Sequence, residues 1–267
     1  MSTGAAAGPT AEQAGGPALV VVARTAEVLA GPGADERTLA GWERRRLDLV
    51  RVPARRDDVL AARLLLRWCV TRLTGGPPHR SALRQHCPDC DRDGHGRPFL
   101  PAHPGLGVSM SHADGLVAAA VGSGPVGVDV EPEDRVPPRF ELLRRRFPAA
   151  GRPPGDATPP NRRSPAVDGL TGPVEAEARF VDGLTRWVEE EARFKAGDAA
   201  LPVHSWNDAP RGARAAVACA GTWWRADLTD LDRVRNRSAG LSGADGRPGP
   251  AGRGGRARAA PGVRTTR

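Results

Sequence analysis

The chain has 267 residues and a formal net charge of +8, the difference between 39 lysine and arginine residues and 31 acidic ones. This length allows one domain or two small domains with a buried core, and the charge favours an anionic partner. No apolar run approaches the roughly 18 residues that span a membrane, and no signal-peptide pattern is present, so we expect a cytoplasmic protein. Four cysteines in a chain of this length do not indicate a disulfide framework.

The first half of the chain predicts strands and one long helix. After a lead-in at 1–17 that we expect to be disordered, residues 18–29 (ALVVVARTAEVL) predict a buried strand. Apolar residues at helical spacing predict a helix over 56–73. Between 106 and 132, three short extended segments are separated by glycine-containing turns and predict one small antiparallel sheet.

The second half contains a Pro-rich stretch, 148–169, which we interpret as an inserted surface loop. A short basic helix is predicted before it at 139–147. The strongest helical pattern follows at 175–197, where Gly183 favours a break. The segments RAAVACAG and TWWRADL then predict two strands, and the Gly/Arg/Pro-rich tail at 238–267 predicts disorder.

Lys195 is the only lysine in the chain and lies in the helix predicted at 175–197. At about 100° per residue this helix has an apolar face, and Glu191 and Lys195 fall at its centre. The apolar residues of that face are Leu184, Trp187, Val188, Ala192 and Phe194. An i,i+4 pair on a surface helix, which stabilises by about 0.2–0.5 kcal/mol, would explain the spacing but not the central position. A carboxylate facing a metal and a compact ammonium facing a phosphate would explain both.

A second acidic pair lies in PVGVDVEP, residues 125–132. On a strand, Asp129 and Glu131 point to the same side, opposite to the two valines between and before them. Two carboxylates on one face repel unless a cation lies between them, and magnesium commonly takes one or two protein carboxylates together with phosphate oxygens. The alternative is a strand that runs into an acidic turn, since further acids follow directly.

The two acidic motifs resemble those of the 4'-phosphopantetheinyl transferase superfamily, of the type that activates surfactin synthetase and other peptide and polyketide synthases. The family pattern G-[VI]-D-[VI]-E matches residues 127–131. The pattern W-x-x-K-E-A-x-x-K matches WVEEEARFK at 187–195, with Glu190 in place of the first lysine. These are the parts of the chain in which the resemblance is most specific.

Three weaker motifs extend the resemblance to roughly residues 40–200. The family's S-H segment before a strand of small residues matches Ser111-His112. Its G-[KR]-P matches GRP at 96–98, and its LLR matches residues 65–67. All of these motifs occur in the family's order.

The resemblance implies a fold, a reaction and a set of partners. The fold is α/β (α+β), with two similar pseudo-symmetric halves at 18–124 and 125–237, each a small, largely antiparallel sheet packed with helices, and with coenzyme A in the cleft between them. The reaction is Mg²⁺-dependent transfer of 4'-phosphopantetheine from coenzyme A to a serine of an apo acyl or peptidyl carrier protein, releasing 3',5'-ADP. The implied protein is a monomer that needs neither a membrane nor a nucleic acid.

The resemblance also assigns site residues. The magnesium ligands that it implies are Asp129, Glu131 and Glu191. The residues that it places on the phosphates and nucleotide of coenzyme A are Arg97, Ser111, His112 and Lys195. The residues that would add contacts to the 3'-phosphate are Arg44, Arg55 or Arg56. Within this set, the catalytic groups are Glu191, which would accept the proton of the attacking serine, and Lys195, which would neutralise the pyrophosphate.

The loop HCPDCDRDGHGRP contains Cys87-x-x-Cys90, which is half of a zinc site. His86 and His95 are close in sequence, and a further ligand would come from elsewhere, such as His103. The alternative is a glycine-rich loop with reduced thiols.

Two other functions stay open. A basic nucleic-acid-binding protein would use the Cys87/Cys90 loop as a zinc knuckle and the tail at 238–267 as an electrostatic arm. That function gives no reason for a lysine and an acid on an apolar helix face. A catalytically inactive relative of the transferases would bind coenzyme A and carrier proteins without turnover.

Overall fold

The computed structural model describes residues 16–75, 83–87, 89–135 and 173–232. They form a mixed α/β fold of small, mostly antiparallel sheets and helices, which confirms the predicted fold class. The arrangement in two pseudo-symmetric halves stays a prediction. No helix in these four ranges is both long enough and apolar enough to cross a membrane.

The first sheet has four strands in the order β10-β1-β6-β5. These strands are β1 (Ala18–Arg24), β5 (Leu106–Ala113), β6 (Leu116–Ser123) and β10 (Trp223–Arg225). β1 pairs antiparallel with β6 and parallel with β10, so the C-terminal part of the described chain returns to its first strand. β6 is buried along almost its whole length, because both faces of this sheet are covered.

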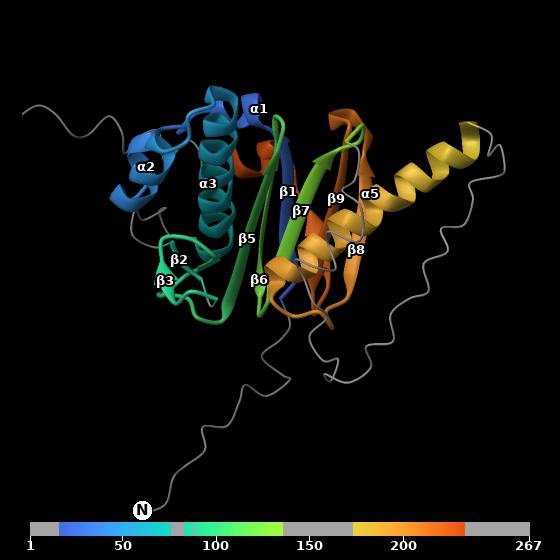
Figure 1. Cartoon of the computed structure of the whole chain (residues 1–267). Coiled ribbons are helices and arrows are strands. Elements are labelled where there is room, and N and C mark those ends of the chain that lie inside the picture. Colours follow the sequence, from blue (N-terminus) through green and yellow to red (C-terminus); the bar gives the residue numbers. More distant parts are fainter. Residues whose placement is uncertain (1–15, 76–82, 88, 136–172, 233–267) are drawn as a thin grey trace, which may run out of the picture.

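One face of the first sheet is covered by α3 (Pro53–Thr74), as Figure 1 shows. The helix begins with Pro53, whose fixed φ suits a first helical turn, and ends at Gly75 in the left-handed conformation. Its leucines and Trp68 pack against β1 in the largest core cluster. This confirms the helix predicted at 56–73. The short helices α1 (Thr25–Leu29) and α2 (Gly41–Asp48) pack beside it.

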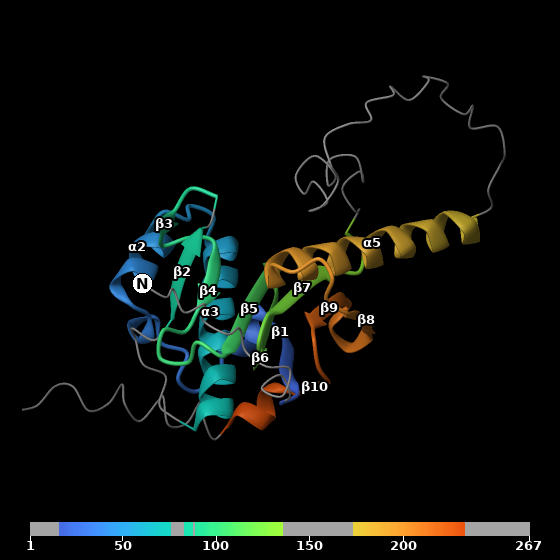
Figure 2. The same ribbon diagram turned by 90° about the horizontal axis from the view of Figure 1, so that it is seen from below.

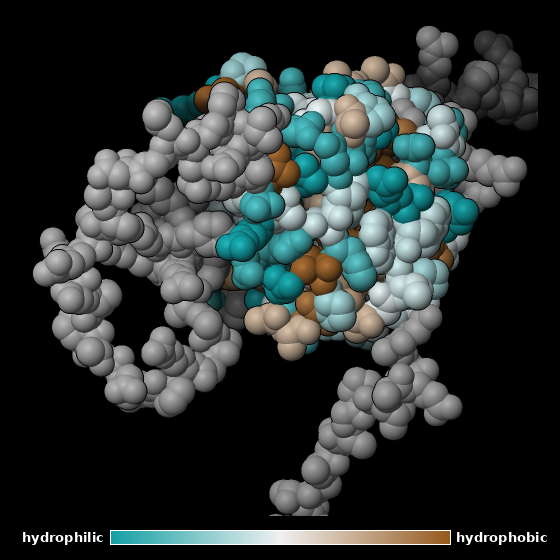
Figure 3. All heavy atoms as spheres, turned by 90° about the vertical axis from the view of Figure 1, so that its right-hand side faces the viewer, coloured by the Kyte–Doolittle hydropathy of each residue, from teal (hydrophilic) through white to brown (hydrophobic). Residues whose placement is uncertain are grey.

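The other face of the first sheet packs on a second sheet with the strand order β7-β9-β8. Its strands are β7 (Val126–Pro132), β8 (Val203–Asp208) and β9 (Ala213–Cys219). The layer between the sheets consists mainly of valine and alanine side chains. α5 (Pro173–Ala196) covers the outer face of the second sheet (Figure 1). The side of the molecule with α5 and β8 mixes hydrophilic atoms with separate small groups of hydrophobic ones (Figure 3).

The strands expected between 106 and 132 are present but are divided between the two sheets. β5 and β6 form the expected antiparallel hairpin, whereas β7 pairs with β9. The prediction of a single sheet is therefore wrong. The reason is the turn at Gly124, where a left-handed conformation sends the chain into the second layer.

Other predicted elements differ in smaller ways. The segment 18–29 is a strand as far as Arg24 and then becomes α1. α5 continues through Gly183 without the expected break. The two strands expected after residue 212 are confirmed as β9 and β10.

Several predictions about the organisation of the chain concern residues outside the described ranges. They are the basic helix at 139–147, the Pro-rich insertion at 148–169, the tail at 238–267 and all but the last two residues of the lead-in at 1–17.

A third sheet, in the order β3-β2-β4, lies on the side of α2 and α3, away from β8 (Figure 2). Its strands are β2 (Arg84–Cys87), β3 (Arg92–Asp93) and β4 (Arg97–Phe99). It has little apolar material of its own. Among the side chains of these three strands only that of Gln85 is buried.

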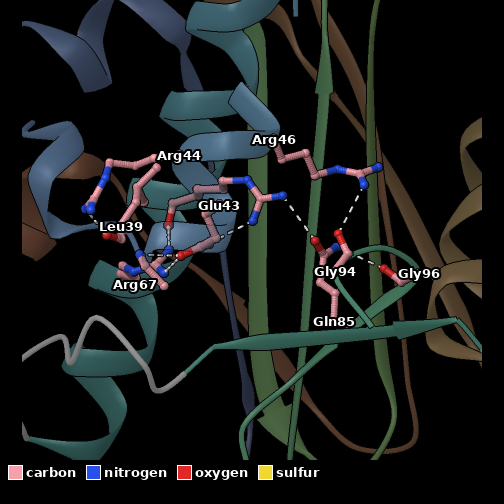
Figure 4. Close-up of polar contacts among 10 residues, drawn as sticks. Leu39, Glu43, Arg44, Arg46, Arg67, Gln85, Gly94 and Gly96 are labelled. Carbon is pink, nitrogen blue, oxygen red and sulfur yellow. Dashed lines mark hydrogen bonds and ion pairs between the residues drawn. The ribbon is translucent and has the colours of Figure 1, made fainter. Parts of the chain in front are cut away.

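A buried ionic cluster joins the third sheet to the helices (Figure 4). Glu43 of α2 is fully buried and accepts hydrogen bonds from Arg63 Nη1, at 2.7 Å, and from Arg67 Nη2. Arg63 Nη2 also donates to Gln85 Oε1 at 3.1 Å, and Gln85 Nε2 donates to the carbonyl oxygen of Gly96 at 2.9 Å. The Glu43 carboxylate therefore joins α2 directly to α3, and it is connected to the third sheet through Arg63.

Removing this carboxylate should destabilise the fold strongly. Glu43→Gln leaves two buried guanidinium groups without their counter-ion, and we expect the free energy of unfolding to fall by about 3–5 kcal/mol. The matched control is Glu36→Gln, which breaks the partly exposed pair with Arg56 and should cost less than about 1 kcal/mol. Urea denaturation of both variants measures the difference, and equal losses would contradict the assigned role of Glu43.

Candidate functional site

Three predicted site residues from three elements meet where β5, β7 and α5 come together. Lys195 Nζ donates hydrogen bonds to Asp129 Oδ1 at 2.5 Å and to Ser111 Oγ at 2.8 Å, and Ser111 Oγ donates to the same Oδ1 at 2.7 Å. Lys195 is separated by 66 and 84 residues from its two partners, so only the tertiary fold creates these contacts. Asp129 and Ser111 are buried, and the Lys195 side chain is 26% exposed.

α5 reaches this position because β7 carries no side chain at Gly127. A Cβ atom there would lie 1.9 Å from the carbonyl oxygen of Ala192. The backbones of the helix and the strand are therefore in direct contact, and Lys195, which follows Ala192 by three residues, is brought down onto Asp129.

The apolar face predicted for this helix is confirmed in part, because Glu191 and Lys195, which were predicted at its centre, are only partly buried. Leu184, Val188 and Ala192 are almost fully buried. Phe194 is 46% exposed, so its assignment to the buried face is wrong. Lys195, the residue before the last one of α5, is partly buried.

The second carboxylate on β7, that of Glu131, lies on the same face as Asp129, as the alternation predicts. Glu131 Oε1 accepts a hydrogen bond from Trp187 Nε1 at 3.1 Å, and Oε2 lies 2.8 Å from Arg135 Nη1. Burial, and then the negative charge of Asp129, raise the pKa of Glu131 to about 7 against the opposing effect of Arg135. Asp129 Oδ2 is buried and has no hydrogen-bond partner within the described part of the chain. β7 therefore carries a buried carboxylate oxygen without a hydrogen-bond partner, next to an acid that keeps its proton up to about pH 7.

The third predicted metal ligand, Glu191, lies on α5 one turn before Lys195 and is partly buried. The ligand atoms of Glu191, Asp129 and Glu131 do not all lie within 4.8 Å of one another. In the described ranges, the ligand atoms of three acidic, histidine or cysteine residues come within 4.8 Å of one another at one place only, Cys87, Cys90 and His95. The assignment of Glu191 as a metal ligand stays a prediction.

His112 follows Ser111 but lines a separate cavity of about 920 Å³. Burial, and then the positive charge of Lys195, lower the pKa of His112, against the opposing effect of Asp58. The charged residues that line the same cavity are the arginines Arg24, Arg55 and Arg135 and the aspartates Asp57, Asp58 and Asp114. Arg135 also pairs with Glu131, so the cavity adjoins the acidic end of β7.

The other predicted basic residues are placed differently. Arg97 Nη2 donates to the carbonyl oxygen of Phe194 at 3.3 Å, so Arg97 caps the C-terminal end of α5 beside Lys195. Arg55 lines the cavity, whereas Arg44 donates to the carbonyl oxygen of Leu39 and Arg56 pairs with Glu36. The structure therefore separates the three arginines that the sequence leaves equivalent.

Two residues of the site were missed by the sequence analysis. Trp187 was assigned to the apolar face, yet its indole Nε1 reaches Glu131. Arg135 stands four residues after Glu131 and pairs with it. The spacing in EPEDR was a usable signal for the second residue, but nothing in the sequence indicates that the tryptophan lies over this acid.

Comparison of the chain with models of known protein families gives no match, and a search of curated proteins gives none either. The function is therefore inferred from the residues of the site.

The raised pKa of Glu131 predicts a specific pH dependence of stability. The folded state keeps this proton up to about pH 7, whereas the unfolded chain releases it near pH 4.5, so stability is lost as pH rises through this window. Glu131→Gln removes that loss. Its free energy of unfolding relative to wild type should rise by about 1–3 kcal/mol between about pH 5 and about pH 8. Urea denaturation at both pH values, in EDTA, measures this, and a constant difference would refute the shift.

Proposed function

We propose that the protein is an Mg²⁺-dependent 4'-phosphopantetheinyl transferase, which moves phosphopantetheine from coenzyme A to a serine of an apo acyl or peptidyl carrier protein. The observation that carries the proposal is the position of the only lysine. Lys195 Nζ is held by Asp129 and Ser111 at the junction of β5, β7 and α5, beside a second buried carboxylate. A compact ammonium next to paired carboxylates suits a pyrophosphate and its magnesium ion.

The acids of β7 fit magnesium as ligands. Asp129 Oδ2 is buried and lacks a hydrogen-bond partner in the described ranges, and Glu131 lies two residues away on the same face. Magnesium prefers oxygen ligands and usually binds one or two protein carboxylates. Asp129 and Glu131 would hold it, with Glu191 added from α5. When bound there, the ion would neutralise the charge of the pyrophosphate, a contribution of several kcal/mol.

The protein's own groups position the reactants. Hydrogen bonds to Asp129 and Ser111 hold Lys195 Nζ in one position. Its positive charge would therefore already be in place when the pyrophosphate binds. The hydroxyl oxygen of the carrier serine forms a bond to the β-phosphorus, the bond from that phosphorus to the bridging oxygen breaks, and 3',5'-ADP leaves. Glu191 accepts the serine proton.

The cavity beside His112 is large enough for the nucleotide end of coenzyme A. Its volume of about 920 Å³ lies within the usual range for ligand sites, about 300–1,000 Å³. The guanidinium groups of Arg24 and Arg55 line it, and Arg135 lies between it and Glu131.

The direct test is mass spectrometry of several apo carrier proteins after incubation with the purified chain, coenzyme A and magnesium. We expect the mass to increase by one phosphopantetheine, and EDTA to abolish the increase until excess magnesium is restored. Coenzyme A binding without any transfer would identify an inactive relative. A chain that neither binds coenzyme A nor transfers phosphopantetheine would overturn the proposal.

Two adjacent acids on α5 provide a matched pair of variants. Glu191→Gln should reduce the rate of transfer by about 10²-fold or more, because the proposed proton acceptor is lost. Glu190→Gln removes an acid that is 56% exposed and paired with Arg193, and should leave the rate within about threefold. Circular dichroism and thermal unfolding verify that both variants fold. Equal rates for the two variants would exclude the role given to Glu191.

A further inference from the structure

A second cluster of reactive side chains lies in the third sheet, away from the proposed transferase site. Cys87 ends β2, and Cys90 and His95 lie on either side of β3. The sulfur and nitrogen atoms of these three residues are all within 4.8 Å of one another, and Cys90 Sγ is 3.1 Å from His95 Nε2. Both cysteines are free thiols, and neither has a part in the proposed transfer.

We infer that this cluster binds a zinc ion through Cys87, Cys90 and His95. Tetrahedral zinc with its usual bond lengths separates a thiolate sulfur from an imidazole nitrogen by about 3.6 Å, and two sulfurs by about 3.8 Å. The observed spacing needs only small side-chain rotations to meet these values. Two thiolates and an imidazole select zinc over magnesium or calcium, which prefer oxygen. A water molecule would fill the fourth position of a tetrahedral site.

Main-chain pairing brings the three ligands together. Cys87 pairs with Arg92 across the β2–β3 hairpin, and the amide of Gly94 donates to the carbonyl oxygen of Gln85 at 2.9 Å. A Cβ atom at Gly96 would lie 2.3 Å from the carbonyl oxygen of His86 and 2.5 Å from the Cα atom of Cys87. Only glycine allows the chain after His95 to pass so close to β2. The fold therefore sets the ligand spacing through its backbone.

The structure also selects among the histidines near the cysteines in sequence. His86 Nδ1 lies 3.2 Å from Asp93 and its Nε2 lies 3.3 Å from Asp91, so its ring faces carboxylates. His103 does not come within reach of the two cysteines. Of the histidines considered from the sequence, His95 is the one that joins the thiols.

A metal here would supply what the third sheet lacks. Within its strands only Gln85 is buried, and Phe99 is 40% exposed, so hydrophobic burial stabilises this unit weakly. Small units without a sufficient core are commonly held by a structural metal. The same sheet carries Arg97 to the C-terminal end of α5, and zinc would keep that arginine in place. This consequence bears on the proposed transferase, whereas zinc binding itself does not depend on it.

The test measures metal in the full-length chain, purified without chelator. Mass spectrometry of the metal content should give about one zinc per chain. Cobalt in place of zinc should give a thiolate-to-cobalt charge-transfer band and the visible bands of a tetrahedral site. Cys87→Ser, Cys90→Ser and His95→Ala should each retain zinc at least about tenfold more weakly, since even changes outside the ligand shell cost about 10–100-fold. The controls Cys219→Ala and His103→Ala should retain it fully.

Three results would overturn the inference. One is a folded chain that holds no zinc and gives no charge-transfer band with cobalt. Another is full zinc retention in His95→Ala, which would remove the imidazole from the site. The third is a Cys87–Cys90 disulfide, detected as resistance of both thiols to alkylation before reduction. Because none of these readouts uses coenzyme A, failure of the zinc site and failure of the proposed transfer are distinguishable.

Discussion

The contact between Lys195 and Asp129 is the interaction on which the arrangement of the candidate site depends. It joins the last turn of α5 to β7 of the second sheet, and Ser111 extends the contact to β5 of the first sheet. A buried carboxylate without a cation costs several kcal/mol, so each partner needs the other in the folded state. The direct approach of the helix at Gly127 makes the pairing geometrically possible.

The cluster around Glu43 solves the same problem in a different way. There one acid is fully enclosed by two arginines of α3, and its charge is compensated within the fold. On β7 the compensation is incomplete, because Asp129 Oδ2 has no hydrogen-bond partner in the described ranges and Glu131 keeps a pKa of about 7. A carboxylate with both oxygens hydrogen-bonded, such as that of Glu43, suits a structural joint, whereas a carboxylate with an unpartnered oxygen is able to accept a further cation.

Local patterns in the sequence correctly predicted the direction in which side chains point within one helix or strand. They did not predict which distant strands pair. The alternation of side chains along a strand predicted that Asp129 and Glu131 share one face, and the helical period predicted that Lys195 faces the sheet. Both predictions depend only on backbone geometry within one element. The transfer of β7 to the second sheet and the return of β10 to β1 were not predicted. They depend on which apolar faces of distant segments fit together. The contact of Trp187 with Glu131 belongs to the same class, since a residue type that packs well in a core also carries a hydrogen-bond donor.

β7 is held between two neighbours, the first sheet on one face and α5 on the other. A buried carboxylate oxygen without a hydrogen-bond partner lowers stability, so the surrounding fold must supply the difference. The valine and alanine layer between the sheets does so on one side of β7, and the tight contact of α5 at Gly127 does so on the other. With its backbone fixed on both faces, β7 cannot turn its carboxylates out to solvent. Asp129 therefore stays directed at Lys195, where the proposed reaction would bring a phosphate and its cation.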